Sequence, residues 1–230
     1  RKIMWAVIKK ELKTYFFSPI GYVFIGLFLA MYSLIFYIMT VQNGAVTYQY
    51  VLFNALMYII AFIMPLLTMR MFPEERKSGT EQILMTSPRS MISITLGKFF
   101  AALIVVGVTE LLTLVYLGII CYFKVPDIPT VIITMIGFLI TSMAYISLGM
   151  FLSSLTENQV IAGISSIAIF ILTWLAPNIS TVFAPLSLIE NFWSFTTGLF
   201  PITQTIRLLS ITVMFIILTI IVMKRRKLVK

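Results

Sequence analysis

The sequence predicts an all-α membrane protein that crosses the bilayer six times. Apolar residues make up 60% of the 230 residues and charged residues only 11%, whereas soluble domains average about 45–50% and 25%. The mean hydropathy of +1.04 agrees with this class. The apolar residues also gather in runs of about 20, the length that an α-helix needs to span a bilayer. Six such runs leave no room for a soluble catalytic domain.

Residues 1–17 have the pattern of a basic amphipathic helix. Two sets of residues mark its faces, the basic Lys2, Lys9 and Lys13 and the apolar Trp5, Ile8, Leu12 and Phe16. Such a helix lies in the membrane interface and not across it. The segment is too charged for the core of a signal peptide and lacks a cleavage-site pattern, so an N-terminal anchor is preferred to a targeting peptide.

The limits of the six spans follow from the polar residues, glycines and prolines between the apolar runs. The predicted spans are 20–41, 51–69, 92–123, 129–152, 160–176 and 203–223. Pro65 predicts a kink near the end of the second span. Residues 178–202 contain Pro185, Pro201 and several aromatic residues, but only one charge, Glu190. They are too broken to span and too apolar for a free loop, which predicts short re-entrant or interfacial helices.

The polar stretch 72–88 separates the second and third spans, and it predicts two short helices. Pro73 suits a first helical position, and Glu74 and Glu75 suit the positive end of the helix dipole. A capping box from Ser78 to Glu81 predicts that a second helix starts there. An ordinary loop with good caps would carry the same signals.

The distribution of lysine and arginine predicts the orientation. Fifteen of the 17 basic residues fall in the N-terminal helix, around residues 72–98, or in the C-terminal tail. Six spans place these three regions on one side, which the positive-inside rule assigns to the cytosol. We therefore expect a multi-pass protein of the plasma or inner membrane with both termini cytoplasmic. The net charge of +9 then belongs to the membrane surface, and no nucleic-acid partner is expected.

Residues for catalysis or metal binding are scarce. The chain has no histidine, and its single cysteine, Cys121, lies in an apolar run as a small hydrophobe. Gly97-Lys98 resembles the end of a phosphate-binding loop, but Ile92 and Phe99 stand where that motif needs glycine and Ser or Thr. We expect no catalytic site, no metal site and no cofactor in this chain.

Two polar residues of the spans are open to two interpretations each. Glu110 is an intramembrane carboxylate, either functional or held structurally by a neighbouring Thr or Tyr. Arg207 either reaches the outer interface, with Glu190 as a partner, or binds substrate. Thr156 to Gln159 forms a second capping box, which predicts the start of the fifth span.

Several stretches together resemble one family. The run FPEERKSGTEQILMTSPRSMISITLGKF, from Phe72 to Phe99, resembles the E-E-R-x-x-G-T-x-E-x-L-L-x-[ST]-P…GK[FL] signature of type-2 ABC exporter permeases, nearest to the gliding-motility-like and copper-maturation-like branch. SSLTENQ at 153–159 and LSLIENFWSFTTG at 186–198 also match in order. Asn191 replaces the usual His and Thr197 the usual Arg, which leaves the branch and the substrate open.

The resemblance implies six spans with an N-terminal elbow helix, a cytosolic coupling helix at 72–88, and re-entrant or extracellular helices before the last span. It also implies a homo- or heterodimer of permeases, surrounded by membrane lipids, on two separately encoded ATP-binding subunits that hold ATP and Mg. Carried over by motif position, the contact with the ATP-binding subunit comprises Glu74, Glu75, Arg76, Gly79, Thr80, Glu81, Leu84, Thr156 and Glu157.

The chain is thus expected to be a prokaryotic permease subunit that exports a lipid-like, amphipathic or peptide substrate without an ATPase site of its own. Two other functions stay open. One is an ATP-independent channel or secondary transporter that uses Glu110. The other is a membrane anchor that recruits a cytosolic protein without transport.

Overall fold

The computed structural model describes residues 2–42, 47–80, 90–123, 125–179 and 185–229, and every regular element in this part of the chain is helical. Five stretches are long and apolar enough to cross a membrane: Pro19–Gln42, Met91–Phe123, Ile128–Leu155, Gln159–Asn178 and Ile202–Arg226. A bent pair of helices after the first of them makes a sixth. The predicted all-α polytopic class is therefore confirmed.

The first half of the chain forms three of these spans. Their elements are α2 (Pro19–Phe36), which continues into the π-helix η1 (Tyr37–Gln42); α3 (Tyr48–Phe62) and α4 (Met64–Thr68); and α7 (Met91–Leu112), followed by α8 (Leu114–Phe123). The bend after α3 is 45°, and Pro65 stands in the first turn of α4. Proline lacks an N–H and its ring clashes with the preceding turn, so the predicted kink is confirmed.

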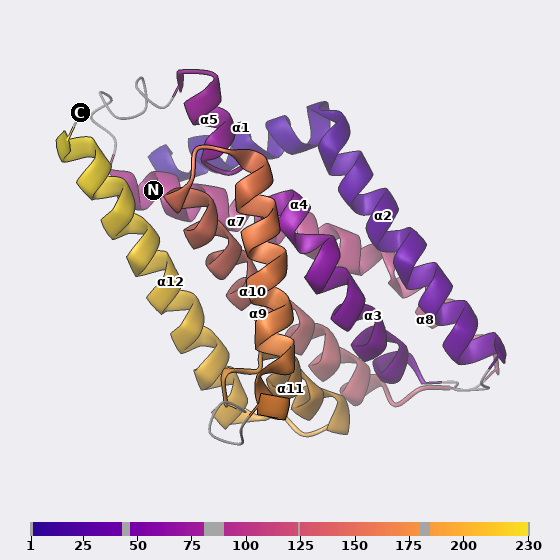
Figure 1. The fold of residues 1–230 in the computed structure, drawn as a ribbon. Helices are drawn as coiled ribbons and strands as arrows, with labels where there is room; N and C mark the ends of the chain where they lie inside the picture. Colours follow the sequence, from indigo (N-terminus) through magenta and orange to yellow (C-terminus); the bar gives the residue numbers. More distant parts are fainter. Residues whose placement is uncertain (1, 43–46, 81–89, 124, 180–184, 230) are drawn as a thin grey trace.

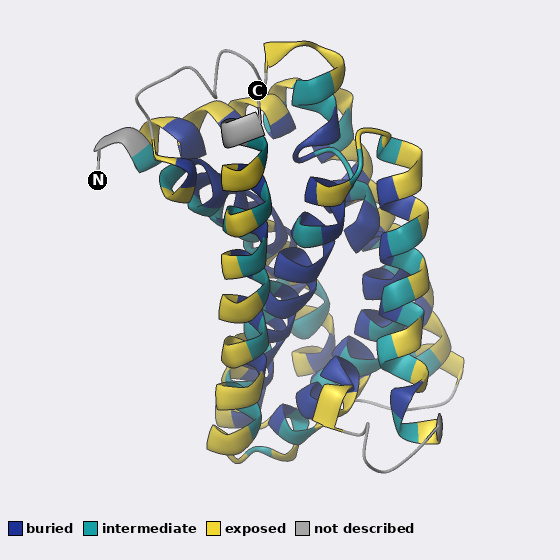
Figure 2. Cartoon of the chain, turned by 60° about the vertical axis from the view of Figure 1, so that its left-hand side comes forward, coloured by how far each residue is buried: buried dark blue, intermediate teal, exposed yellow. Residues whose placement is uncertain are grey.

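The second half contributes α9 (Ile128–Leu155), α10 (Gln159–Ile179) and α12 (Ile202–Val229). Helix α9 is central: 61% of its most apolar stretch is buried, against 33% or less in the other four straight spans. It contacts α7, α10 and α12 and carries many buried serine, threonine and glycine residues, which let neighbouring helices approach closely. Figure 2 shows the resulting pattern, with buried segments inside and exposed faces outside.

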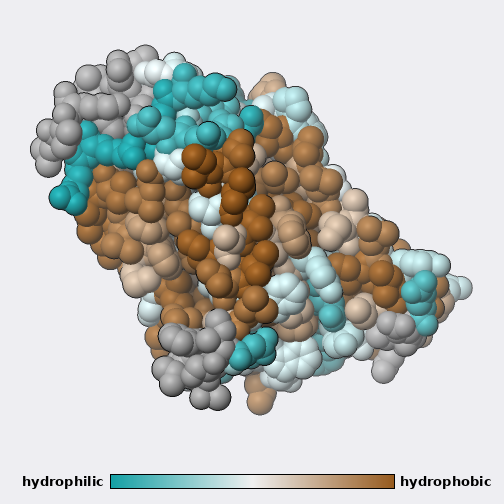
Figure 3. Space-filling view, viewed as in Figure 1, coloured by the Kyte–Doolittle hydropathy of each residue, from teal (hydrophilic) through white to brown (hydrophobic). Residues whose placement is uncertain are grey.

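Short helices lie at the two ends of this bundle (Figure 1). Helices α1 (Lys2–Phe17) and α5 (Pro73–Lys77) lie at the end where the C-terminus also lies, and α11 (Leu188–Trp193) with the 3₁₀ helix η3 (Ser194–Thr197) lies near the opposite end. Hydrophilic surface gathers around the end with α5, while apolar surface covers the middle (Figure 3). We call these the α5 end and the α11 end.

The face of α1 that packs on the protein overlaps with the predicted apolar stripe and is wider than it. Val7, Glu11 and Tyr15 are buried, whereas Trp5 is 64% exposed. Within the predicted stripe, Ile8 is also buried, and Leu12 and Phe16 are half-buried and pack against the core. The four stripe residues line an open groove of about 300 Å³. Helix α1 therefore packs on the bundle through most of its apolar residues, while Trp5 and Phe17 remain exposed and available to the membrane interface.

Gly97 allows α1 to lie directly on α7. A Cβ at this position would come within 2.6 Å of Cγ1 of Val7 and 2.8 Å of its Cβ. Val7 is itself buried and β-branched, so it has little freedom to move aside.

We predict that Gly97→Ala lowers the thermal stability of the purified protein by about 1–3 kcal/mol, the usual cost of overpacking. The control is Gly118→Ala on α8, where an added Cβ meets nothing within 4 Å and alanine favours the helix. The apparent melting temperature in detergent is the measurement. Equal melting temperatures for both variants would contradict the close contact between α1 and α7.

Candidate functional site

A cluster of four charged side chains joins α1, α5 and α7 at the α5 end; three of them are largely buried, and the fourth, Lys10, is 54% exposed. Lys98 of α7 is at its centre, with a side chain only 3% exposed. Its Nζ lies 3.0 Å from Oε1 of Glu75 and 3.2 Å from Oε1 of Glu11. Nζ of Lys10 lies 2.9 Å from the same Glu75 oxygen and 3.5 Å from Oε1 of Glu11. We call these four residues the buried charge cluster.

The cluster balances its charge, with two cations and two anions. Burying a single lysine would be costly, but each buried charge here has an opposite charge at hydrogen-bond or ion-pair distance. Nζ of Lys98 also lies 5.6 Å from the centre of the Phe72 ring, within cation–π range. Three segments distant in sequence are therefore held together by one lysine.

The pKa values of Glu75 and Lys10 reflect these contacts. Burial alone raises the pKa of the Glu75 carboxyl, but the charges of Lys98 and Lys10 outweigh it, so the pKa of Glu75 is lowered. Burial alone lowers the pKa of Lys10, but Glu75 and Glu11 outweigh it, so the pKa of Lys10 is raised. Both shifts favour the charged forms.

Arg76, the next residue along α5, contacts the other half of the bundle. Its guanidinium donates to the backbone oxygens of Thr156 and Ser154, the latter at 2.8 Å, and lies 3.8 Å from the sulfur of Met223 on α12. The backbone N–H of Phe72 adds a bond of 3.4 Å to Oγ of Ser153. Helix α5 is therefore attached to α1 and α7 through Glu75, and to the end of α9 and to α12 through Arg76.

The residues expected to contact an ATP-binding subunit thus fall into two groups. Glu75 and Arg76 make contacts within the chain, and Glu74 is half-buried beside a small cavity that Arg70 also lines. Exposed positions begin after them, at Lys77 to Thr80. Gly79 ends α5 with φ of +72°, a left-handed angle that suits glycine. Glu81 and Leu84, and with them half of the predicted capping box, lie outside the described residues.

The second expected contact region lies beside α5. The backbone oxygen of Thr156 accepts from Arg76, and the side chain of Glu157 is 75% exposed, with its Oε1 3.6 Å from Nη1 of Arg226. Residues 73–80 and 156–157, about 80 positions apart, therefore lie side by side at the α5 end.

The capping box predicted at Thr156 is wrong in its chemistry. Asn158 caps α10, since its Oδ1 accepts from the N–H of Val160 at 2.8 Å. Oγ1 of Thr156 instead accepts from the N–H of Asn158 at 3.0 Å and closes a turn before the helix. Both side chains prefer to bond a backbone N–H two residues ahead, and the local turn decides which one starts the helix.

Glu110 is buried among tyrosine and threonine residues in the membrane-spanning part of α7. It is 1% exposed, and its Oε1 has no hydrogen-bond partner. Nearby, the hydroxyl groups of Tyr48 and Thr113 form a hydrogen bond of 2.9 Å. Oγ1 of Thr113 also donates to the backbone oxygen of Glu110 at 2.7 Å. Within the described chain no basic residue forms an ion pair with Glu110.

The expected pair of Arg207 and Glu190 is not formed. Both side chains are exposed, and no ion pair between them is found in the described residues. Asn191, at the position that differs from the family pattern, is buried and donates to the backbone oxygen of Ser187 at 2.8 Å. Asn191 thus supports the local turn of α11. Cys121 is exposed on α8, in an apolar span, as expected of a residue that faces lipid.

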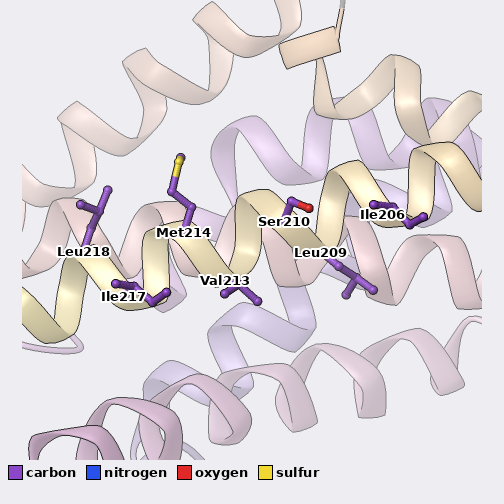
Figure 4. A pocket seen from close by; sticks show the side chains of 7 residues that line it. All are labelled: Ile206, Leu209, Ser210, Val213, Met214, Ile217 and Leu218. Carbon is purple, nitrogen blue, oxygen red and sulfur yellow. The ribbon is translucent and has the colours of Figure 1, made fainter.

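A second apolar feature is an open groove of about 660 Å³ on α12 (Figure 4). The side chains that line it follow the length of this helix: Ile206, Leu209, Ser210, Val213, Met214, Ile217 and Leu218. Ser210 supplies its only hydroxyl group. Such a groove suits an acyl chain or another apolar surface.

The sequence alone did not identify the buried charge cluster. Its members are separated by as many as 88 positions, so no spacing rule connects them. The one available signal was Glu11, a single acid in an otherwise basic helix. In the sequence Lys98 counts as one more cytosolic base, although its side chain is buried.

We predict that Lys98→Met destabilises the protein strongly, because two buried carboxylates would then face each other with only Lys10 between them. Removal of one partner from a buried ion pair typically costs about 3–5 kcal/mol. The control is Lys77→Met, which removes an exposed lysine of the same α5 end. If the two variants melt at the same temperature in detergent, the cluster has no structural role.

A pH dependence follows from the shifted pKa values. Since the pKa of Glu75 is lowered by folding, its contribution is complete above its unfolded value of about 4.3 and is lost as the pH falls through the folded value. Since the pKa of Lys10 is raised, its contribution is complete below about 10.4 and is lost as the pH rises through the folded value. The stability difference between the parent and Glu75→Gln should therefore stay constant from about pH 5 to pH 10 and shrink at lower pH. Melting curves across pH are the measurement, and a difference that grew on acidification would contradict the assignment.

Comparison with known proteins places the chain in a family of membrane transporters. The family model described as "ABC-2 family transporter protein" matches residues 28–223. No curated protein matches the chain. The matched region extends from α2 to the last turns of α12 and includes α5 and the loop before α10. The chain therefore belongs to the ABC-2 transporter family, as one of its multi-pass membrane components.

Proposed function

We propose that the chain is the permease subunit of an ABC exporter and that a separate ATP-binding subunit moves it by pushing on α5. The observation that carries this proposal is the pair of neighbouring residues Glu75 and Arg76. Glu75 contacts α1 and α7 through the buried charge cluster, and Arg76 contacts the end of α9 and α12. A force on this short helix would reach both halves of the bundle at once.

The docking face in this proposal consists of the exposed residues that surround those two anchors. Its described members are Lys77, Ser78, Gly79, Thr80 and Glu157. These positions combine charge with small side chains, and they lie at the hydrophilic end of the molecule (Figure 3). The concentration of basic residues at this end supports a cytosolic location for it, with both termini on the same side.

ATP binding in the partner would act by population shift. The ATP-bound partner must prefer one arrangement of the permease, since a ligand with equal affinity for two states shifts nothing. ATP and Mg²⁺ belong to the partner in this scheme, and this chain supplies the path for the cargo. Two ATP-binding subunits and a second permease, identical or different, complete the transporter.

A lipid-like or amphipathic cargo fits the apolar character of the spans. The groove on α12 is open along the helix and nearly free of polar groups, so it favours an acyl chain over a hydrophilic solute. Peptide cargo with apolar side chains would fit the same surface.

We predict that Thr80→Arg reduces recovery of the ATP-binding subunit in co-purification and leaves the melting temperature unchanged, because Thr80 is exposed. Glu75→Gln should have the opposite signature: the partner is recovered in full, but substrate-stimulated ATP hydrolysis falls several-fold since the buried charge cluster transmits the motion. Thr203→Arg, an exposed threonine on α12 at the α11 end, is the control. Full recovery and full stimulation with Thr80→Arg would reject the docking face.

A second candidate is an ATP-independent channel or secondary transporter. The observation in its favour is Glu110, whose buried Oε1 lacks a partner, because buried acids in spans often bind protons or ions.

We predict that Glu110→Gln preserves ATP-dependent transport within about twofold, as expected for a group held in the helix bundle by packing. Transport in proteoliposomes that contain both subunits is the measurement, made across a range of pH. A pH-dependent loss of transport in this variant, or transport by the permease alone, would favour the second candidate.

A further inference from the structure

A cavity of about 620 Å³ at the α11 end combines aromatic side chains with a carboxylate. Residues of α3, α10 and α11 and of their flanks line it: Phe53, Met57, Trp174, Pro177, Asn178, Ser187, Ile189, Glu190 and Trp193. Its size is within the usual range of small-molecule sites. Helix α11, which contributes part of the lining, lies at the end of the bundle opposite α5 (Figure 1).

The aromatic walls are fixed by contacts with other rings. Phe53 lies 4.6 Å from Trp193 at an interplanar angle of 71°, and it stacks on the buried Phe192 at 6.0 Å. Trp174, on the α10 side, contacts Tyr58 edge to face at 6.4 Å. Trp193 remains 46% exposed, so part of its indole ring is available to a ligand.

Glu190 is held at the rim of this cavity without a partner for its charge. The N–H of Glu190 donates to Oγ of Ser187 at 3.3 Å, which caps α11 and fixes the backbone. Its carboxylate makes no ion pair or hydrogen bond within the described part of the chain, although Arg207 lies on the next span. The two acids of the buried charge cluster, Glu11 and Glu75, are by contrast paired.

We propose that this cavity binds an amphipathic organic cation, with its ammonium group between the aromatic rings and Glu190 and its apolar tail along Phe53 and Met57. Faces of tryptophan and phenylalanine attract cations, most strongly when the cation is alkylated and weakly hydrated. The carboxylate adds attraction for the cation and repels anions. Met57 provides an adaptable surface for the tail. The site is independent of the proposed transport function, because its binding requires no ATP-binding subunit.

The alternative is an ordinary aromatic belt at the membrane interface. Such a belt would interact with lipid through its rings and would not depend on Glu190. The two explanations therefore differ in how binding responds to the charge at this one position.

The experiment is a fluorescence titration of the full chain in dodecyl maltoside with decyltrimethylammonium as the probe. The chain has three tryptophans, so a Trp5→Phe background leaves Trp174 and Trp193 as reporters, both at the cavity. We expect saturable binding that Glu190→Gln weakens about fivefold, the upper end of the range for an exposed charge pair. Asp127→Asn removes the same charge from the α9 cap, away from the cavity lining, and should leave the affinity unchanged.

Three further arms give the test its outcomes. Glu190→Lys should reverse the preference, so that decyl sulfate binds and the ammonium probe does not. Since an unfolded variant would bind neither compound, gain of decyl sulfate binding also shows that the fold is intact. Decylphosphocholine tests the source of the cation, since equal binding indicates a lipid headgroup and weaker binding indicates a free ammonium compound. Equal affinities for the parent, Glu190→Gln and Asp127→Asn, or equal binding of decyl sulfate by the parent, would overturn the proposal and leave an aromatic belt.

Discussion

The arrangement of the α5 end depends on the neutralisation of one buried lysine. Lys98 lies on an apolar span with a side chain that is 3% exposed, and an unpaired charge there would be strongly unfavourable. Glu11 and Glu75 must both approach it, which fixes α1 and α5 on α7. Gly97, the residue before Lys98, also contributes, because the absence of a side chain there allows α1 to approach α7 closely. Charge and shape thus specify one arrangement of three segments.

This constraint gives α5 an unusual role for a helix of five residues. A helix so short has little stability of its own, and it is held in place by contacts on both sides. Glu75 connects it to the first half of the chain, and Arg76 connects it to the second half through backbone oxygens at the end of α9. Its position is therefore coupled to the relative position of the halves, whatever pushes on it.

The sequence predicted the class and the approximate spans well, since these depend on apolar runs that are visible in one dimension. Five helices start at Pro19, Met91, Ile128, Gln159 and Ile202, each within one residue of the predicted start, while the second span starts at Tyr48, three residues early. The sequence could not predict the candidate site in detail. Which way Glu75 and Arg76 point depends on Lys98 and Thr156, whose places beside α5 result from tertiary packing. Arg76 also binds backbone oxygens, which have no sequence signature. The cap at Asn158 was missed because Thr156 offers the same local chemistry two residues earlier.

Helix α9 is the element that relates the two ends of the molecule. At its last turn, Ser153 and Ser154 bind Phe72 and Arg76 beside α5. Near its start, Oγ1 of Thr134 donates to the backbone oxygen of Phe195, in the 3₁₀ helix that follows α11. One uninterrupted helix of 28 residues therefore contacts both the α5 end and the α11 end. Because its packed surface consists of small residues against close neighbours, it cannot shift at one end without moving those contacts at the other. Helices α5 and α11 are consequently connected through a single helix that contacts the surroundings of both.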